Sequence, residues 1–152
     1  MKKYKSLIKE KVFSVSEGNK EFIKAKINCS RDINEYVRQF YFDDISIFES
    51  FFIVLLNSHL NTIGYAKISQ GGTTQTLVDP KLVAKYAIDT LACSVILCHN
   101  HPSGNITPSQ SDKDLTNKIK DTLEIFNCKV LDHIIITPDP MKYYSFADEG
   151  II

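Results

Sequence analysis

The sequence predicts a single domain of the α/β class, and three observations support this prediction. Short apolar, β-branched runs alternate with stretches in which apolar residues recur at helical spacing. The chain has 152 residues, 43% hydrophobic and 24% charged, which is the balance of one soluble globular domain. A polar loop with two histidines directly follows an apolar run, and α/β proteins place their chemistry at such strand ends.

The composition argues against a membrane or secreted protein. The longest apolar runs are far shorter than the roughly 20 residues that a membrane-spanning helix needs. The lysine-rich residues 1–11 are not followed by the apolar segment of a secretory signal. Cys29, Cys93, Cys98 and Cys128 form no C-x-x-C pair, and the last three lie in or beside apolar runs. We therefore expect a cytoplasmic protein without a disulfide framework.

The charges are unevenly distributed, although 18 Lys and Arg residues balance 18 Asp and Glu residues. Lys and Arg outnumber Asp and Glu in residues 1–38, so the rest of the chain is acidic. The basic stretch from Lys2 to Lys26 would suit nucleic acid or an acidic partner. Lysines scattered over a solvated surface are the alternative interpretation.

The first half of the chain predicts one helix and three strands. Residues 21–27 alternate as a short strand, and Ser30 is placed to cap the helix that follows. Residues 51–60 and 62–69 are β-rich runs separated at Asn61, as in an antiparallel hairpin. The helix carries its apolar residues at Ile33, Tyr36, Val37 and Phe40.

Two helices and three strands complete the expected fold. Pro80 opens the first helix, because proline is tolerated in a first helical turn, and a short buried strand follows that helix directly. The second helix starts after Pro108. We expect these helices at residues 81–91 and 109–126 and the strands at 94–98, 128–137 and 144–146. The two apolar faces comprise Leu82, Val83, Tyr86, Ala87 and Leu91, and Leu115, Ile119, Leu123 and Phe126.

The candidate site lies in the loop after the buried strand. His99 and His101 are two residues apart on an extended segment, so their imidazoles project to the same side. Ser109 and Asp112 begin the next helix, and the loop 102–108 is long enough to fold this turn back over the strand end. Two histidines and an aspartate with one open position are typical of a catalytic zinc site.

A zinc hydrolase also needs a group that takes a proton from the attacking water. Glu49, just before the first strand of the hairpin, is the leading candidate for this general base. A solvated carboxylate at the start of a strand is the alternative interpretation.

The order and spacing of these residues resemble a known family. His99 and His101, then Ser109 after seven residues and Asp112 after two more, match the H-x-H-x7-S-x2-D signature of the JAMM metallopeptidases, which contain a JAB/MPN domain. Glu49 lies where this family has its upstream glutamate. More narrowly, the chain resembles the RadC proteins at His-Asn-His-Pro-Ser-Gly (99–104), Thr-Pro-Ser (107–109) and Leu-Asp-His-Ile-Ile (131–135).

The resemblance implies a cytidine-deaminase-like α/β fold, with a central mixed sheet flanked by helices. A RadC-like JAB/MPN domain would occupy residues 30–152, after a leading segment of residues 1–29. The sequence contains no counterpart of the helix-hairpin-helix module of longer RadC proteins, which weakens the case for DNA binding. The segment 79–82 also lacks the His and the Arg-Glu pair usual around this proline in the family.

The resemblance also implies the role of each site residue. His99, His101 and Asp112 would bind one zinc ion, Glu49 would activate the attacking water, and Ser109 would hydrogen-bond the developing oxyanion. The ligand chemistry alone leaves the metal open, because His and Asp also accept iron, manganese or nickel.

Several of these residues have structural interpretations too. Ser109 and Asp112 form a helix-capping arrangement, which is compatible with metal binding. Asp132 and His133 either orient a zinc ligand from behind or satisfy their own hydrogen bonds within a strand. Asn100 points to the opposite face from the histidines and is expected to make hydrogen bonds in the loop.

Two functions are consistent with the sequence. The leading hypothesis is a RadC-like zinc-dependent hydrolase, a metallopeptidase or isopeptidase that cleaves an amide bond in a peptide or protein substrate. The RadC label associates such proteins with DNA repair. The alternative is a non-enzymatic accessory protein of DNA repair or mobile elements that binds nucleic acid or protein.

Overall fold

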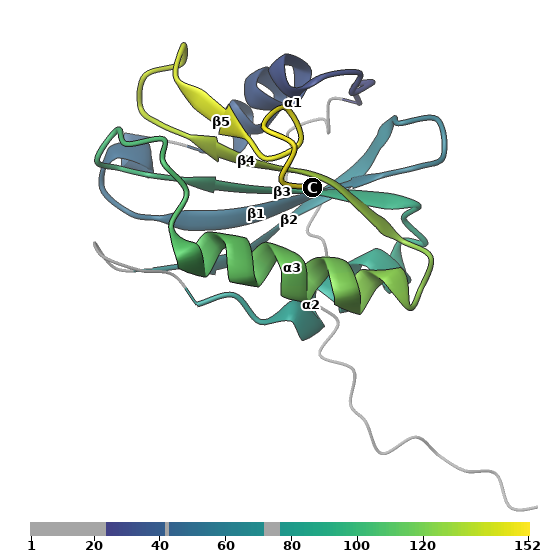
Figure 1. The fold of residues 1–152 in the computed structure, drawn as a ribbon. Helices are drawn as coiled ribbons and strands as arrows, with labels where there is room; N and C mark the ends of the chain where they lie inside the picture. The colour runs from purple at the N-terminus through teal and green to yellow at the C-terminus, as the bar shows by residue number, and fades with distance from the viewer. Residues whose placement is uncertain (1–23, 42, 72–76) are drawn as a thin grey trace, which may run out of the picture.

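The most continuously apolar runs of the chain form the two central strands of a sheet. In the computed structural model, which describes residues 24–41, 43–71 and 77–152, five strands lie in the order β2-β1-β3-β4-β5 (Figure 1). Every residue of the neighbouring strands β1 and β3 is buried. The strands are β1 (Ser50–Leu56), β2 (Thr62–Gln70), β3 (Ser94–Asn100), β4 (Lys129–Ile136) and β5 (Tyr143–Ser145).

The sheet is mixed, as expected. β3 and β4 run parallel, and every other neighbouring pair is antiparallel. Parallel strands need a crossover connection, and helix α3 (Gln110–Glu124) provides it. The expected single α/β domain with a central mixed sheet is therefore confirmed.

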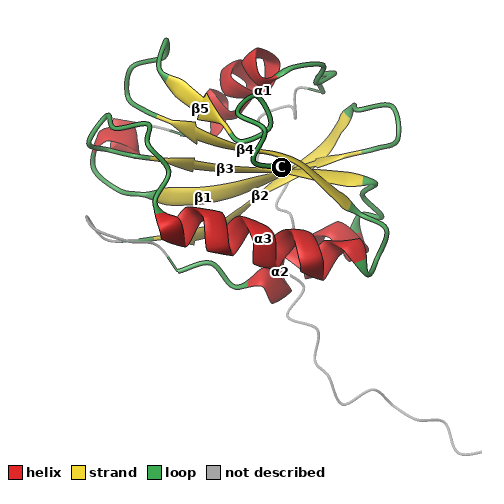
Figure 2. Cartoon of the chain, in the orientation of Figure 1, coloured by secondary structure: helices red, strands yellow, loops and turns green. Residues whose placement is uncertain are grey.

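Helices cover both faces of the sheet (Figure 2). Helix α1 (Ser30–Val37) lies on one face, and α2 (Pro80–Asp89) lies with α3 on the other. Two short 3-10 helices, Arg38–Phe40 and Asp43–Ser46, connect α1 to β1. The strands β1 and β3 are covered on both sides, which explains the unbroken apolar runs at residues 51–56 and 95–98.

The pleat of the strands divides the core into two clusters. In β3, Val95 and Leu97 pack toward α2 and α3, whereas Ile96 and Cys98 pack toward α1. The alternation continues along the strand, so His99 belongs to the face that α3 covers. Asn100 belongs to the opposite face, where its amide donates to the carbonyls of residues 45 and 48 and its oxygen accepts from the amide of Ser50. The predicted hydrogen-bonding role of Asn100 is confirmed.

The helix ends differ from the sequence predictions at two apolar residues. Leu91 was expected on the buried face of α2, but the helix ends at Asp89 and Leu91 has a φ of 52° and is 83% exposed. Helix α3 ends at Glu124, and Phe126 lies two residues beyond it and is 50% exposed. Both residues lie beyond the end of a helix, where helical periodicity no longer determines the direction of a side chain.

Three other expectations need correction. Ser30 is the first residue of α1, not its cap, and its hydroxyl bonds to Asp148 and Tyr143 instead. The strand expected at 21–27 is reduced, from residue 24 onward, to a single bridge between Lys26 and Asn61, and residues 21–23 lie outside the described part. Cys93 is exposed rather than packed as a small apolar residue.

Some strand boundaries also move. The strand predicted at 51–60 ends at Leu56, because residues 57–61 form the hairpin turn with Leu60 at a φ of 61°. The strand predicted at 94–98 continues through Asn100. Among the described residues, no helix has the length and apolarity needed to cross a bilayer. Of the basic stretch from Lys2 to Lys26, residues 2–23 lie outside the described part of the chain.

Truncation of a core side chain beneath α2 and α3 is expected to lower the free energy of unfolding. Leu97 is 0% exposed, so Leu97→Ala should lower the free energy of unfolding by about 2–5 kcal/mol through lost burial and a residual cavity. Leu91→Ala is the matched control, with an expected change below about 0.5 kcal/mol. Urea unfolding measures both variants, and equal losses would contradict this description of the core.

Candidate metal centre

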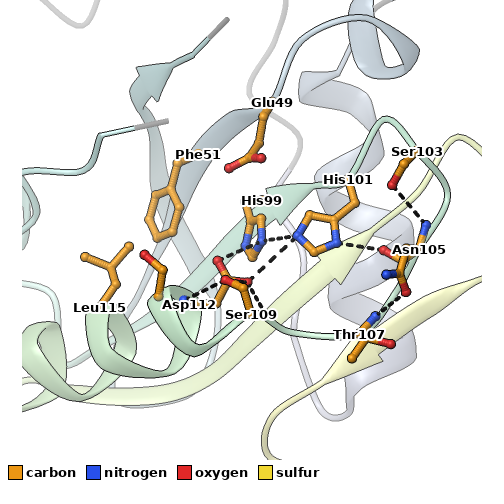
Figure 3. Close-up of a pocket in the computed structure, with 11 residues that line it drawn as sticks. Glu49, Phe51, His99, His101, Ser103, Asn105, Thr107, Ser109, Asp112 and Leu115 are labelled. Atoms are coloured by element: carbon orange, nitrogen blue, oxygen red, sulfur yellow. Dashed lines mark hydrogen bonds and ion pairs between the residues drawn. The ribbon is translucent and has the colours of Figure 1, made fainter. Parts of the chain in front are cut away.

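A cavity of about 420 Å3 opens where β3 ends and α3 begins (Figure 3). Its walls come from the start of β1, the loop after β3 and the first turns of α3. No Lys or Arg is among the described residues that line it. All five residues predicted to form the site line this cavity: Glu49, His99, His101, Ser109 and Asp112.

His99 is held at the bottom of the cavity by the sheet. It is 1% exposed, pairs in register with Phe51 of β1, and its ring stacks on Phe51 with a centroid distance of 6.1 Å. Burial lowers the pKa of His99 to about 4, an effect that the Asp112 carboxylate opposes and His101 reinforces. The His99 imidazole is therefore neutral at pH 7 and able to act as a metal ligand.

His101 projects to the same side because the extended conformation persists past the end of β3. Its amide donates to the carbonyl of Ile136, which continues the pairing with β4. Its Nδ1 lies 2.7 Å from the carbonyl oxygen of Asn105. A carbonyl can only accept, so Nδ1 carries the proton and Nε2 presents a lone pair to the cavity. Gly104, with a φ of 78°, turns the loop so that this carbonyl reaches His101.

The two carboxylate oxygens of Asp112 have different partners. One carboxylate oxygen, Oδ2, accepts from the amide and the hydroxyl of Ser109, and the Ser109 hydroxyl accepts from the Asp112 amide. This is the predicted capping box, which starts α3. The other oxygen, Oδ1, lies 3.4 Å from His99 Nε2. The two expected features, capping and proximity to the histidines, therefore occur together in one side chain.

The three predicted ligands form a compact cluster. The Nε2 atoms of His99 and His101 are 2.9 Å apart, Asp112 Oδ2 lies 3.9 Å from His101 Nε2, and one ligand atom from each residue lies within 4.8 Å of the others. Two imidazole nitrogens and one carboxylate suit a divalent transition metal. The donor chemistry therefore fits the metal that the resemblance implies, and the residues form a candidate metal site of unspecified metal.

Glu49 approaches the cluster from the start of β1. It immediately precedes Ser50, and its own carbonyl accepts from the amide of Gly71 in the chain that continues from β2. Figure 3 shows its carboxylate directed into the cavity, on the side of His99 away from α3. The position of Glu49 along the chain does not show that it lies near the histidines. The antiparallel pairing of β1 with β3 brings them together.

Asp132 and His133, for which the sequence allows two interpretations, make different contacts. Asp132 satisfies hydrogen bonds at the C-terminal segment: it accepts from the Ser145 hydroxyl and from the amide of Ala147. His133 is buried, and its Nε2 lies 2.8 Å from His99 Nδ1. A further residue on this network, Thr116, carried no recognisable signal in the sequence and lies 2.6 Å from His133 Nδ1.

Comparison with known proteins identifies relatives of this chain. The family described as the RadC-like JAB domain matches residues 27–151. A UPF0758 protein of Flavobacterium johnsoniae is 50% identical over 103 residues, which cover 68% of this chain and 44% of the relative. A UPF0758 protein of Chlorobaculum parvum is 32% identical over 130 residues, with 86% of this chain and 57% of the relative covered.

A third relative also matches about two thirds of this chain. The UPF0758 protein YfjY of Escherichia coli is 38% identical over 104 residues, which cover 68% of this chain and 64% of the relative. In these three comparisons the chain spans 44% to 64% of the relative's length.

The buried histidines make the metal-free protein sensitive to acid. Burial lowers the pKa of His99 to about 4 and that of His133 well below 6.5, so below pH 6.5 the unfolded chain binds protons that the native protein does not. The contribution of these two imidazoles to the free energy of unfolding is therefore fully present above pH 6.5. It falls toward pH 4, by up to about 1.4 kcal/mol per pH unit for each imidazole. Urea unfolding at pH 7, 6 and 5 measures this slope, and a flat profile would contradict it.

Proposed function

This chain belongs to the RadC family of JAB domains, and we propose that it is a zinc-dependent hydrolase that cleaves amide bonds in a peptide or protein substrate. One observation carries the proposal: His99, His101 and Asp112 converge within 4.8 Å in a cavity that Glu49 also lines. Two imidazole nitrogens and a carboxylate would hold the metal, and three protein ligands are the usual set of a catalytic zinc site.

Zinc, when bound, supplies a Lewis acid that polarises a carbonyl and makes water a nucleophile near neutral pH. The protein supplies the proton transfers. Glu49 takes the proton of the attacking water and passes it to the leaving amine, which is the task of a carboxylate directed into the same cavity. His99 and His101 keep their Nε2 lone pairs for the metal and take no part in this transfer.

Ser109 is suited to stabilise the oxyanion that forms on the substrate carbonyl. Its hydroxyl lines the cavity at the start of α3, where the helix amides also favour negative charge. In the structure this hydroxyl donates to Asp112 Oδ2, so it must rotate to donate to the substrate.

The rim of the cavity supports a peptide as the substrate. Ser103, Asn105 and Thr107 line it with hydroxyl and amide groups, and these can hydrogen-bond an extended main chain. Phe51 and Leu115 add apolar surface deeper in the cavity. The proposed class is therefore a peptidase or isopeptidase.

Metal content is the first test of the proposal. The untagged protein, supplied with zinc at neutral pH, should hold close to one zinc per chain by plasma mass spectrometry. His101→Ala and Asp112→Ala should each lose it, because each removes one of three ligands. Asp114→Ala is the matched control, since Asp114 is an exposed carboxylate on the same helix and should leave zinc bound. Wild-type protein without zinc would remove the basis of the proposal.

Glu49→Gln separates proton transfer from metal binding. The variant should keep zinc, because Glu49 is not one of the three clustered ligands, and should lose about 10²–10⁴-fold in turnover because the amide cannot take a proton. Cleavage of linear and isopeptide-linked peptide libraries, followed by mass spectrometry, measures the effect. Glu124→Gln, at the exposed end of α3, should cleave as the wild type does. Full turnover by Glu49→Gln would refute the proposed base.

A further inference from the structure

A buried hydrogen-bond chain extends behind His99, on the side away from the cavity. His99 Nδ1 lies 2.8 Å from His133 Nε2, and His133 Nδ1 lies 2.6 Å from the hydroxyl of Thr116. The Thr116 hydroxyl also lies 2.6 Å from the main-chain carbonyl of Asp112. Three side chains and one carbonyl thus form a continuous relay, and all three side chains are at most 1% exposed. The proposed hydrolysis makes no use of His133 or Thr116.

The direction of every proton in this relay follows from its last member. The Asp112 carbonyl can only accept, so the single hydroxyl proton of Thr116 points toward it. The Thr116 oxygen must then accept from His133 Nδ1, which leaves His133 Nε2 with a lone pair. That lone pair accepts from His99 Nδ1. A proton on Nδ1 leaves Nε2 of His99 as a lone pair, and Nε2 is the atom that faces His101 and Asp112.

The reverse arrangement is penalised. If His99 carried its proton on Nε2, His133 would have to donate from its own Nε2, and its Nδ1 would need the Thr116 proton. The contact of 2.6 Å between Thr116 and the Asp112 carbonyl would then contain two acceptors and no proton. Only one tautomer of His99 satisfies all contacts in the relay. In that tautomer the Nε2 lone pairs of His99 and His101 face each other at 2.9 Å, so this contact holds no proton in the metal-free protein. Water in the cavity can satisfy these two lone pairs, whereas the relay is buried and its groups depend on one another.

We propose that His133 and Thr116 are positioning residues that hold His99 in the tautomer whose Nε2 lone pair faces the metal. The inference rests on the proposed metal site and adds two residues to its machinery. His101 needs no such relay, because its Nδ1 bonds directly to the carbonyl of Asn105. The two histidines therefore reach the same tautomer by different means, one through a loop carbonyl and the other through two intervening side chains.

Thr116→Val tests the relay with little change in shape. The valine cannot accept from His133 Nδ1, which would leave a buried N–H without a partner. We therefore expect His133 to reverse and His99 to move its proton to Nε2, where it can donate to His101 Nε2. Zinc affinity, measured by competition with a chromophoric chelator, should fall by about 10–100-fold. Thr116→Ser restores the hydroxyl and should bind zinc as the wild type does. Thr122→Val is the matched control: Thr122 makes the same hydroxyl bond, to the Lys118 carbonyl on the same helix, outside the relay.

The tautomer itself is read from the imidazole nitrogen-15 chemical shifts of His99 in metal-free protein. We expect Nδ1 protonated in the wild type, in Thr116→Ser and in Thr122→Val, and Nε2 protonated in Thr116→Val. Thermal unfolding of each variant checks that it folds. The tautomer of His99 in the wild type can be measured even if a variant does not fold. A wild-type His99 protonated on Nε2, or a Thr116→Val with wild-type tautomer and zinc affinity, would overturn the inference. A protein with the expected tautomer and zinc that hydrolyses nothing would contradict the proposed function alone.

Discussion

The two-residue repeat of β3 is the constraint on which the rest of this structure depends. Because the strand is buried on both faces, its odd-numbered residues must face α2 and α3 and its even-numbered residues must face α1. A shift of one residue would place apolar side chains in the cavity and His99 in the core under α1. The apolar packing of Val95 and Leu97 therefore orients His99, the next residue on the same face of the strand. The geometry of the site thus depends on the packing of the core.

Much of the site is organised by main-chain carbonyls and helix capping rather than by additional charged groups. The carbonyl of Asn105 fixes which ring nitrogen of His101 carries the proton, and the carbonyl of Asp112 does the same for His99 through the relay. The capping box of Ser109 restrains the Asp112 carboxylate beside both rings. A main-chain carbonyl can only accept a hydrogen bond, so each of these contacts fixes the nitrogen that must donate to it.

The parts of the fold that depend on local patterns could be predicted from the sequence, and the parts that depend on pairing between distant segments could not. Alternation places His99 and His101 on one side, and the Ser-x-x-Asp spacing marks the start of α3. The contact of His99 with His133 requires the parallel register of β3 and β4, which no local pattern specifies. Leu91 and Phe126 show the same limit, because the ends of their helices depend on capping geometry rather than periodicity.

The shared carboxylate of Asp112 would couple metal binding at the proposed site to the integrity of α3. One oxygen closes the first turn of the helix while the other faces His99, so an ion held there would also restrain the beginning of the crossover between β3 and β4. By mass action, a ligand at one hundred times its dissociation constant stabilises the native state by about 2.7 kcal/mol. Chelation would thus loosen a structural connection of the sheet, and the cell's supply of metal would influence the lifetime of the folded chain as well as its chemistry.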